Sequence, residues 1–171
     1  MSLARQAVIE LAALDAAAAT FEYDDACSWF DAVRPTFAEP LAVEVWAFDE
    51  AMAQVLLVKH RWRGWVPPGG AVQAKESPRA AAVRELREET GLHAVLARTP
   101  AAVAVRAYAV EWPATLGLSY ATFVPRDSPV RGEAGQPVQW HAIDDPWDSS
   151  FPEDRNRMLR YQQLLRSTPP S

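Results

Sequence analysis

The stretch of sequence that decides the fold is GGAVQAKESPRAAAVRELREETGL, residues 69–92. Its second half carries the signals of a helix, because Ser77 can cap the amino terminus and Pro78 suits the first helical position. Gly91 suits the carboxyl-terminal cap, where a left-handed backbone is common. We therefore expect a helix that begins after Ser77, ends at Gly91 and is entered through a flexible Gly-Gly turn.

Three carboxylates crowd one side of this helix. At about 100° per residue, Glu85, Glu88 and Glu89 project into an arc of about 100°. Like charges at this spacing repel, so they are either a solvated face screened by arginines or the ligands of a cation. Glu76 at the helix entry and the Gly-Gly turn before it favour the cation. Carboxylate and carbonyl oxygens are ligands that suit Mg²⁺ or Mn²⁺.

The same stretch resembles the Nudix box. In that pattern, a glycine is followed after five residues by a glutamate. Seven residues later come Arg-Glu, an aliphatic residue, any residue, Glu-Glu, any residue, a glycine and an aliphatic residue. The chain matches every fixed position, at Gly70, Glu76, Arg84, Glu85, Leu86, Glu88, Glu89, Gly91 and Leu92.

The resemblance implies both a fold and a reaction. The fold would be α/β, a Nudix-type α/β/α sandwich with a mixed β-sheet. The protein would be a metal-dependent pyrophosphohydrolase that cleaves a pyrophosphate bond in a nucleoside diphosphate linked to another moiety, such as a nucleoside triphosphate. Two alternatives stay open: a dinucleoside polyphosphate hydrolase, and a non-catalytic Nudix-fold module that senses a nucleotide. The intact box favours the enzyme.

Carried over residue by residue, the resemblance also implies roles within the box, with Mg²⁺ or Mn²⁺ as the cofactor. The implied metal ligands are Gly70, through its carbonyl, and Glu76, Glu85, Glu88 and Glu89. Arg84 would orient the carboxylates, and Glu76 would either pair with Arg84 or touch a metal through water. Two candidates for the general base stay open, because some family members use a box glutamate and others use one from a distant loop: Glu85 in the box, and Glu133 in the loop 125–137.

Basic residues just before the Gly-Gly turn are candidates for substrate binding. Strand alternation would place Lys59, Arg61 and Arg63 on one face, if the strand extends that far, where they could meet a polyphosphate. A solvated strand end is an equally good interpretation.

Aromatic residues are further candidates, because an aromatic face can stack on a nucleobase. Trp46 and Trp65 fall near strands or loops that could border the cleft, as do Trp62 and Trp112, although large aromatic side chains often pack in a core. Tyr108 lies 16 positions after Leu92, where dinucleoside polyphosphate hydrolases often carry a tyrosine.

The rest of the chain predicts an N-terminal helical extension, residues 1–40, and a Nudix domain, residues 41–171. Helices are expected at 3–19, from Asp24 or Asp25 to before Pro35, and at 153–166; strands are expected at 41–50, 53–60, 94–110, 118–124 and 137–143. In the first helix the apolar stripe would be Leu3, Ala7, Leu11, Leu14 and Ala18.

Composition restricts the partners. The 171 residues carry a net charge of −5, so no broad basic field invites polymeric nucleic acid. No apolar run approaches the length of a membrane span, so no membrane partner is expected. Cys27 is the only cysteine, which favours a reducing compartment and a cytoplasmic location. The expected partner is a small nucleotide substrate, and the family resemblance also admits a homodimer.

Overall fold

The computed structural model describes residues 2–168; residues 1 and 169–171, at the outer ends of the predicted extension and domain, lie outside the described range. The helices are α1 (Leu3–Ala18), α2 (Ala26–Val33), a short 3-10 turn η1 (Arg34–Thr36), α3 (Pro78–Thr90) and α4 (Glu153–Ser167). The strands are β1 (Phe21–Glu22), β2 (Ala42–Asp49), β3 (Gln54–His60), β4 (Gly64–Val66), β5 (Gly69–Ala71), β6 (Ala102–Arg106), β7 (Thr115–Val124) and β8 (Val138–Ala142).

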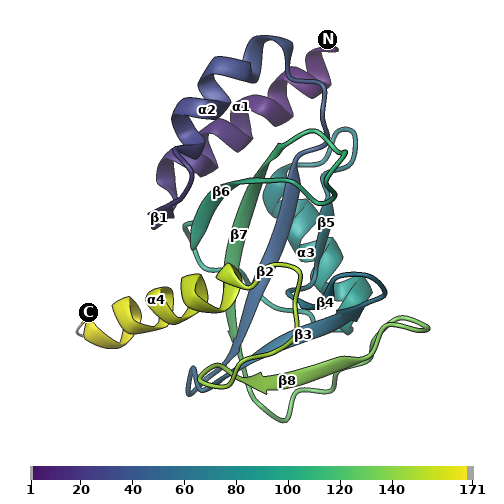
Figure 1. Cartoon of the computed structure of the whole chain (residues 1–171), viewed down its shortest axis with the longest axis vertical. Coiled ribbons are helices and arrows are strands. Elements are labelled where there is room, and N and C mark those ends of the chain that lie inside the picture. Colours follow the sequence, from purple (N-terminus) through teal and green to yellow (C-terminus); the bar gives the residue numbers. More distant parts are fainter. Residues whose placement is uncertain (1, 169–171) are drawn as a thin grey trace.

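The strands form one mixed sheet in the order β1-β6-β7-β2-β3-β4, with β5 paired to β2 and β8 paired to β3 (Figure 1). The central strand β2 runs parallel to β7 along its whole length, from Ala42↔Gly117 to Asp49↔Val124. Its other edge is shared, because residues 42–44 pair with β5 and residues 47–48 pair with β3. The sheet therefore forks at β2. Gly69 and Gly70, expected as a flexible turn, lie in strand β5 at this fork, and we keep the name Gly-Gly turn for these two residues.

Two hydrophobic clusters lie on opposite faces of the sheet. One contains Ile9 of α1, Phe30 of α2 and Leu86 of α3, together with sheet residues such as Val45. The other is built around α4, which crosses the sheet in Figure 1. Because helices cover both faces of a mixed sheet, the predicted α/β/α sandwich with an N-terminal helical segment is confirmed.

The N-terminal segment packs directly on the rest of the molecule. Val8, Ile9 and Ala12 of α1 belong to the same buried cluster as strand β2, and β1 adds to the sheet edge by pairing in parallel with β6. The Tyr120 hydroxyl of β7 also hydrogen-bonds the Asp15 carboxylate of α1. The boundary at residue 40 between extension and domain stays a prediction.

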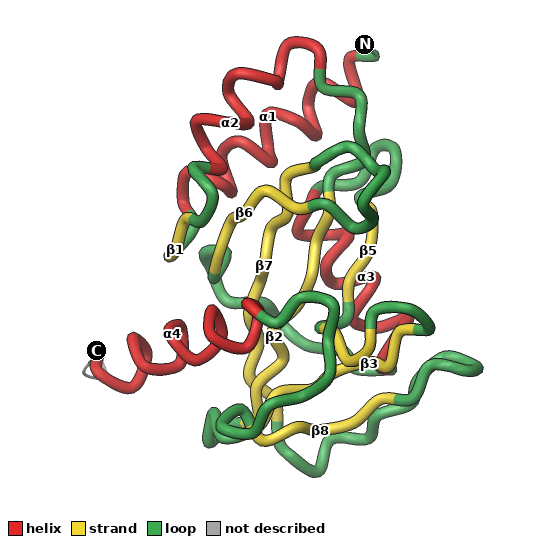
Figure 2. Tube along the Cα trace, in the orientation of Figure 1, coloured by secondary structure: helices red, strands yellow, loops and turns green. Residues whose placement is uncertain are grey.

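Two local predictions were wrong. In α1 the buried residues are Val8, Ile9, Ala12 and Ala16, whereas Leu11 and Leu14 are exposed. An alanine-rich helix offers more than one stripe at helical spacing, and packing selects among them. In the segment 94–110, only residues 102–106 form a strand. Residues 107–114 connect β6 to β7 as an irregular loop (Figure 2).

None of the helices within residues 2–168 combines the length and apolar character needed to cross a bilayer. The cytoplasmic location and the homodimer stay predictions.

Candidate active site

Residues at its two ends determine where α3 begins and ends. The Ser77 hydroxyl accepts a hydrogen bond of 3.1 Å from the Ala80 N–H, as expected of an amino-terminal cap. At the other end Gly91 has a positive φ of 74° and donates its N–H to the Arg87 carbonyl. Both caps agree with the sequence prediction, so the box glutamates are held on a helix of defined start and end.

The Gly-Gly turn approaches β2 and α3 so closely that side chains are excluded. A Cβ on Gly69 would lie 2.3 Å from the Val43 carbonyl oxygen of β2, and a Cβ on Gly70 would lie 2.5 Å from Oε1 of Glu85. In addition, the Gly69 N–H donates a 2.8 Å hydrogen bond to Oε2 of Glu89. The turn backbone therefore lies against two of the predicted metal ligands.

Arg84 gathers three of the box carboxylates. Its guanidinium donates two hydrogen bonds to Glu76, from Nε to Oε1 (2.8 Å) and from Nη2 to Oε2 (3.0 Å). Its Nη1 donates to Glu85 Oε1 at 2.6 Å and to Glu88 Oε2 at 3.2 Å. The hydrogen bonds from Arg84 lower the pKa of Glu76. We call Glu76, Arg84, Glu85 and Glu88 the Arg84 cluster.

Glu89 is the box carboxylate whose charge is least compensated. Its pKa is raised from 4.5 to about 7, mainly by burial, with further increases from the charges of Glu85, Glu133 and Glu88. The hydrogen bond from Gly69 opposes this rise. Glu133, the predicted loop candidate for the general base, therefore lies close enough to repel Glu89.

The oxygen ligands that surround the Gly-Gly turn are chemically suited to a divalent cation. Carboxylate oxygens from Glu85 and Glu89 and backbone oxygens of the turn are hard ligands. Within residues 2–168, no three His, Cys, Asp or Glu side chains converge as a preformed metal site. The guanidinium of Arg84 lies between the carboxylates of Glu85 and Glu88 in this arrangement.

A cavity of about 260 Å³ opens beside the turn. Gly69, Gly70 and Glu89 belong to its lining, which ties it to the box. The remaining lining residues come from β2 with the segment before it, from the end of β3 through β5, and from the segments around Tyr108 and Asp154. Most of its lining surface is apolar, as in small-molecule binding sites that place a few polar groups in an apolar pocket.

Among the predicted basic contacts, only Arg63 lines this cavity; Lys59 and Arg61 do not. The condition for a shared strand face is not met, because β3 ends at His60 and residues 61–63 form a turn. His60 lines the cavity instead, and burial, with the charge of Arg63, lowers its pKa.

The predicted aromatic contacts divide in the same way. Tyr108 lines the cavity, with its ring 5.6 Å from that of Phe151 and under the guanidinium of Arg63. Trp65 packs against His141 outside the cavity lining, at 4.5 Å between ring centroids. Trp46 as a substrate contact was wrong, because its side chain is fully buried. Alternation along β2 turns Trp46 toward α4, where it packs edge-on to Tyr161.

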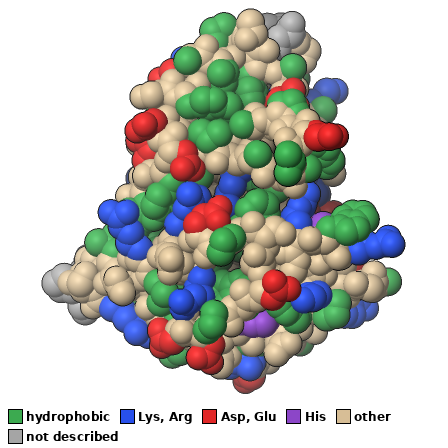
Figure 3. Space-filling view, viewed as in Figure 1, with side chains coloured by type: hydrophobic (Ala, Val, Ile, Leu, Met, Phe, Trp, Pro, Cys, Tyr) green, Lys and Arg blue, Asp and Glu red, His purple; other side chains and the backbone are tan. Residues whose placement is uncertain are grey.

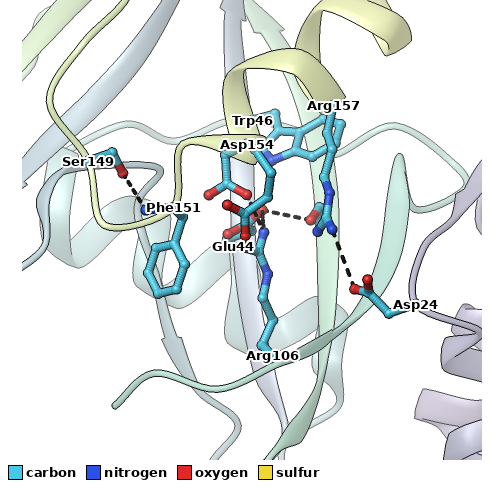
Figure 4. A network of polar contacts seen from close by, with 10 residues as sticks. Asp24, Glu44, Trp46, Arg106, Ser149, Phe151, Asp154 and Arg157 are labelled. Carbon is cyan, nitrogen blue, oxygen red and sulfur yellow. Dashed lines mark hydrogen bonds and ion pairs between the residues drawn. The ribbon is translucent and has the colours of Figure 1, made fainter. Parts of the chain in front are cut away.

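A second group of charges lies at the cavity, and the sequence prediction missed it. Arg106 contacts Asp154 Oδ1 at 2.5 Å, Glu44 Oε1 at 3.4 Å and Glu153 Oε1 at 3.4 Å (Figure 4). We call Glu44, Arg106, Glu153 and Asp154 the Arg106 cluster. One signal was available, since Glu44 interrupts the apolar run LAVEVWAF at residues 41–48. Burial raises the pKa of Asp154, and the charge of Glu44 raises it further.

Acidic and basic side chains also intermingle across the middle of the face shown in Figure 3.

Solved structures of other proteins share the fold described above. The chain is similar to the crystal structure of a NUDIX family hydrolase from Clostridium perfringens (17% identity, TM-score 0.59, covering 76% of this chain and 98% of that one). It is similar to a C. elegans Ap4A hydrolase in a binary complex (16%, 0.62, 76% and 100%). It also resembles the NUDIX domain of Shewanella oneidensis NrtR complexed with ADP ribose (18%, 0.59, 82% and 98%). No curated protein sequence matches significantly.

At these identities the structural likeness supports the fold. The family itself rests on the sequence, because the NUDIX domain model matches residues 38–162. That match spans most of the chain and contains the complete box, the Gly-Gly turn and the residues of both clusters. The chain therefore belongs to the NUDIX hydrolase family.

Proposed function

We propose that the protein is a metal-dependent pyrophosphohydrolase that cleaves a nucleoside diphosphate linked to another moiety, with a nucleoside triphosphate or a similar nucleotide as the substrate. The observation that carries this proposal is the uncompensated acid next to the Gly-Gly turn. Glu89 keeps a pKa of about 7 beside Glu85, Glu88 and Glu133, and it lines the cavity. A cation bound there would relieve that repulsion.

Mg²⁺ or Mn²⁺ would be held by the carboxylates of Glu85, Glu88 and Glu89 and by the Gly70 carbonyl. When bound, it would neutralise phosphate charge and lower the pKa of a water molecule. The protein's own task is to keep these oxygens in place. Arg84 positions Glu85 and Glu88 by hydrogen bonds. Two hydrogen bonds to Glu76 in turn position Arg84.

Two carboxylates remain candidates for accepting the proton of the attacking water. Glu85 lies against Gly70, close to where the metal would bind. Glu133 is exposed on the 125–137 loop and acts electrostatically on Glu89. Because Glu85 is also a proposed metal ligand, Glu133→Gln is the variant that decides: it should remove activity if Glu133 is the base and leave activity near wild type if Glu85 is.

The similar structures extend the set of substrates to be tested. One is an Ap4A hydrolase and another binds ADP ribose, so dinucleoside polyphosphates and nucleoside diphosphate sugars belong in the panel. Tyr108 in the cavity lining supports contact with a nucleoside in any of these compounds. The substrate is proposed as a small molecule.

The test is a nucleotide panel incubated with Mg²⁺ or Mn²⁺, with the products identified by mass. We expect a pyrophosphate bond to be cleaved in at least one compound. Chelator should abolish this cleavage, and adding back the cation should restore it. Full cleavage in excess chelator would reject the metal assignment. Binding without any cleavage across the panel would instead support the non-catalytic nucleotide-sensing module.

A further inference from the structure

The end of the cavity next to the Arg106 cluster is rich in hydrogen-bond acceptors. Glu44 and Asp154 both line the cavity. Arg106 contacts both of them, and it also serves Glu153. One guanidinium thus faces three carboxylates and contacts one oxygen of each.

One of these acceptors is unpartnered within residues 2–168. Asp154 Oδ1 receives the hydrogen bond from Arg106, but Oδ2 is buried and has no hydrogen bond. The side chain of Asp154 is only 2% exposed. Because buried polar atoms are normally paired, an orphaned carboxylate oxygen on a residue that lines a cavity calls for a hydrogen-bond donor that the described chain does not supply.

Hydrogen bonds from neighbouring side chains hold Glu44 in place, and one of its two carboxylate oxygens accepts them. Its Oε1 accepts from Trp46 Nε1 at 2.8 Å and from the Ser119 hydroxyl at 2.7 Å. Figure 4 shows Glu44 and Asp154 approaching the guanidinium of Arg106 from β2 and from α4. Two carboxyl groups from different elements thus meet at one site, in fixed positions.

The surrounding walls suit a flat ring. Phe151 and Tyr108 stand at 75° to one another with their centroids 5.6 Å apart, and Trp112 and Pro113 line the same cavity. The Trp112 side chain is mostly exposed, so its face is available for stacking. Planar aromatic walls around a few polar acceptors favour a nucleobase over a sugar or a flexible chain.

This end of the cavity is also next to the predicted phosphate end. Glu44 is paired with Gly69 in the register of β2 and β5. A single nucleotide can therefore place its phosphates at the Gly-Gly turn and its base at the Arg106 cluster.

We propose that this subsite, formed by Glu44 and Asp154 with Tyr108, Trp112 and Phe151, binds a purine with two adjacent N–H donors, so that the substrate is a guanine nucleotide. The inference rests on the proposed function. Guanine presents its N1–H and its 2-amino group side by side, so one group can donate to Glu44 and the other to Oδ2 of Asp154. Adenine presents one amino group beside the N1 acceptor, which would face carboxylate lone pairs. Hypoxanthine keeps N1–H and lacks the 2-amino group.

The first test uses the wild-type protein and ligands that it does not hydrolyse. These are the α,β-methylene diphosphates of guanosine, inosine and adenosine, in which carbon replaces the bridging oxygen. With Mg²⁺ present, calorimetry should give the tightest binding for guanosine, followed by inosine and then adenosine. We expect a ratio of about 10-fold or more between guanosine and adenosine. Equal affinities, or no binding of the guanosine compound, would overturn the base assignment.

The second test compares two variants that each remove one negative charge beside Arg106. Asp154→Asn exchanges one acceptor oxygen for an amide donor, so the guanosine-to-adenosine ratio should fall about 10-fold or more. Glu153→Gln is the matched control, because Glu153 is 45% exposed and contacts Arg106 but lies outside the cavity lining. It should keep the wild-type ratio. An equal fall in both variants would show a general charge effect and refute the subsite.

The two proposals fail in distinguishable ways. Equal affinities for the three methylene compounds refute the guanine subsite and leave hydrolysis untouched. Failure to cleave any compound of the nucleotide panel refutes the proposed hydrolysis, while the affinity ratios still decide the base. Should Asp154→Asn not fold, as judged by circular dichroism, the wild-type ratios alone decide.

Discussion

The Arg84 cluster and the Arg106 cluster share a composition and differ in construction. Each surrounds one arginine with three carboxylates. The first comes from residues 76–88 on a single helix and its entry, whereas the second joins β2, β6 and α4 across more than half of the chain. The arginine side chain is 15% exposed in the first and 5% exposed in the second.

This difference in exposure and construction suggests that the two clusters have different roles. A cluster that borders solvent on one helix can exchange its partners, as a metal-binding site must. A cluster locked between a sheet and a helix cannot do so without disturbing the core. We therefore expect changes in the Arg84 cluster and Glu89 to affect turnover, and changes at Arg106 to affect the fold.

The largest expected effect is on activity. Glu85→Gln and Glu89→Gln should each slow turnover by roughly 10²–10⁴-fold, because each removes a metal ligand or the base. Their melting temperatures without metal should stay at or rise above the wild-type value, since a like charge has been removed from the helix face. Arg87→Gln is the control, because Arg87 is exposed and outside the Arg84 cluster. Near-full turnover in both variants would show that the acids are only a solvated face.

The next effect is on stability. Arg106→Met leaves Glu44 and Asp154 without their cation at a buried site, and should cost about 3–5 kcal/mol in the free energy of unfolding. The matched change Arg84→Met should cost less, about 1–3 kcal/mol, because its partners are 14–44% exposed whereas Asp154 is 2% exposed. Denaturant titrations of both variants measure the contrast. Equal losses of stability would remove the distinction between the two clusters.

A smaller change can be made at the turn. In Gly70→Ala the new Cβ would lie 2.5 Å from the Glu85 carboxyl. That carboxyl is the mobile end of a side chain, so it should shift and leave the fold intact. We expect turnover to fall about 10–100-fold, because a displacement of this size misplaces a catalytic group. Wild-type kinetics in a folded Gly70→Ala protein would show that Glu85 is not positioned by this contact.

The smallest effect concerns pH. Because the folded-state pKa of Glu89 is raised from 4.5 to about 7, the folded protein binds more protons than the unfolded chain between these values. Stability in chelator should therefore fall as pH rises through this window, by on the order of 1–2 kcal/mol. Melting curves in chelator at several pH values measure the slope, and Glu89→Gln should flatten it. A rise in stability over this window would contradict the assigned pKa.

What could be predicted from sequence follows the same division. The caps of α3 and the spacing of the box acids are local features of the sequence. The helix, its acidic face and the nearby Gly-Gly turn could therefore be predicted from the sequence. The pairing of Glu76 with Arg84 was one of two alternatives, and the structure shows that pairing. The roles of these residues in metal binding and catalysis stay predictions.

The Arg106 cluster depends on contacts that no local pattern contains. Arg106 meets Glu44 and Asp154 only because β6 and β2 both pair with β7, and because α4 packs over them. Trp46 was misplaced for the same reason, since strand periodicity gives two faces without saying which one a helix covers. The turn at residues 61–63 moved Arg61 out of the expected face.

The parallel pairing of β2 with β7 has a consequence for how the chain folds. Ala42 pairs with Gly117 and Asp49 with Val124, so the centre of the sheet closes only after a connection of more than half the domain has formed. Contacts of such separation slow folding. During synthesis β2 is made long before β7. Until β7 has been made, the edge of β2 that pairs with it stays open, and its run of apolar residues can pair with other chains. Expression at lower temperature, or with chaperones, should therefore raise the yield of this protein more than changes to its surface.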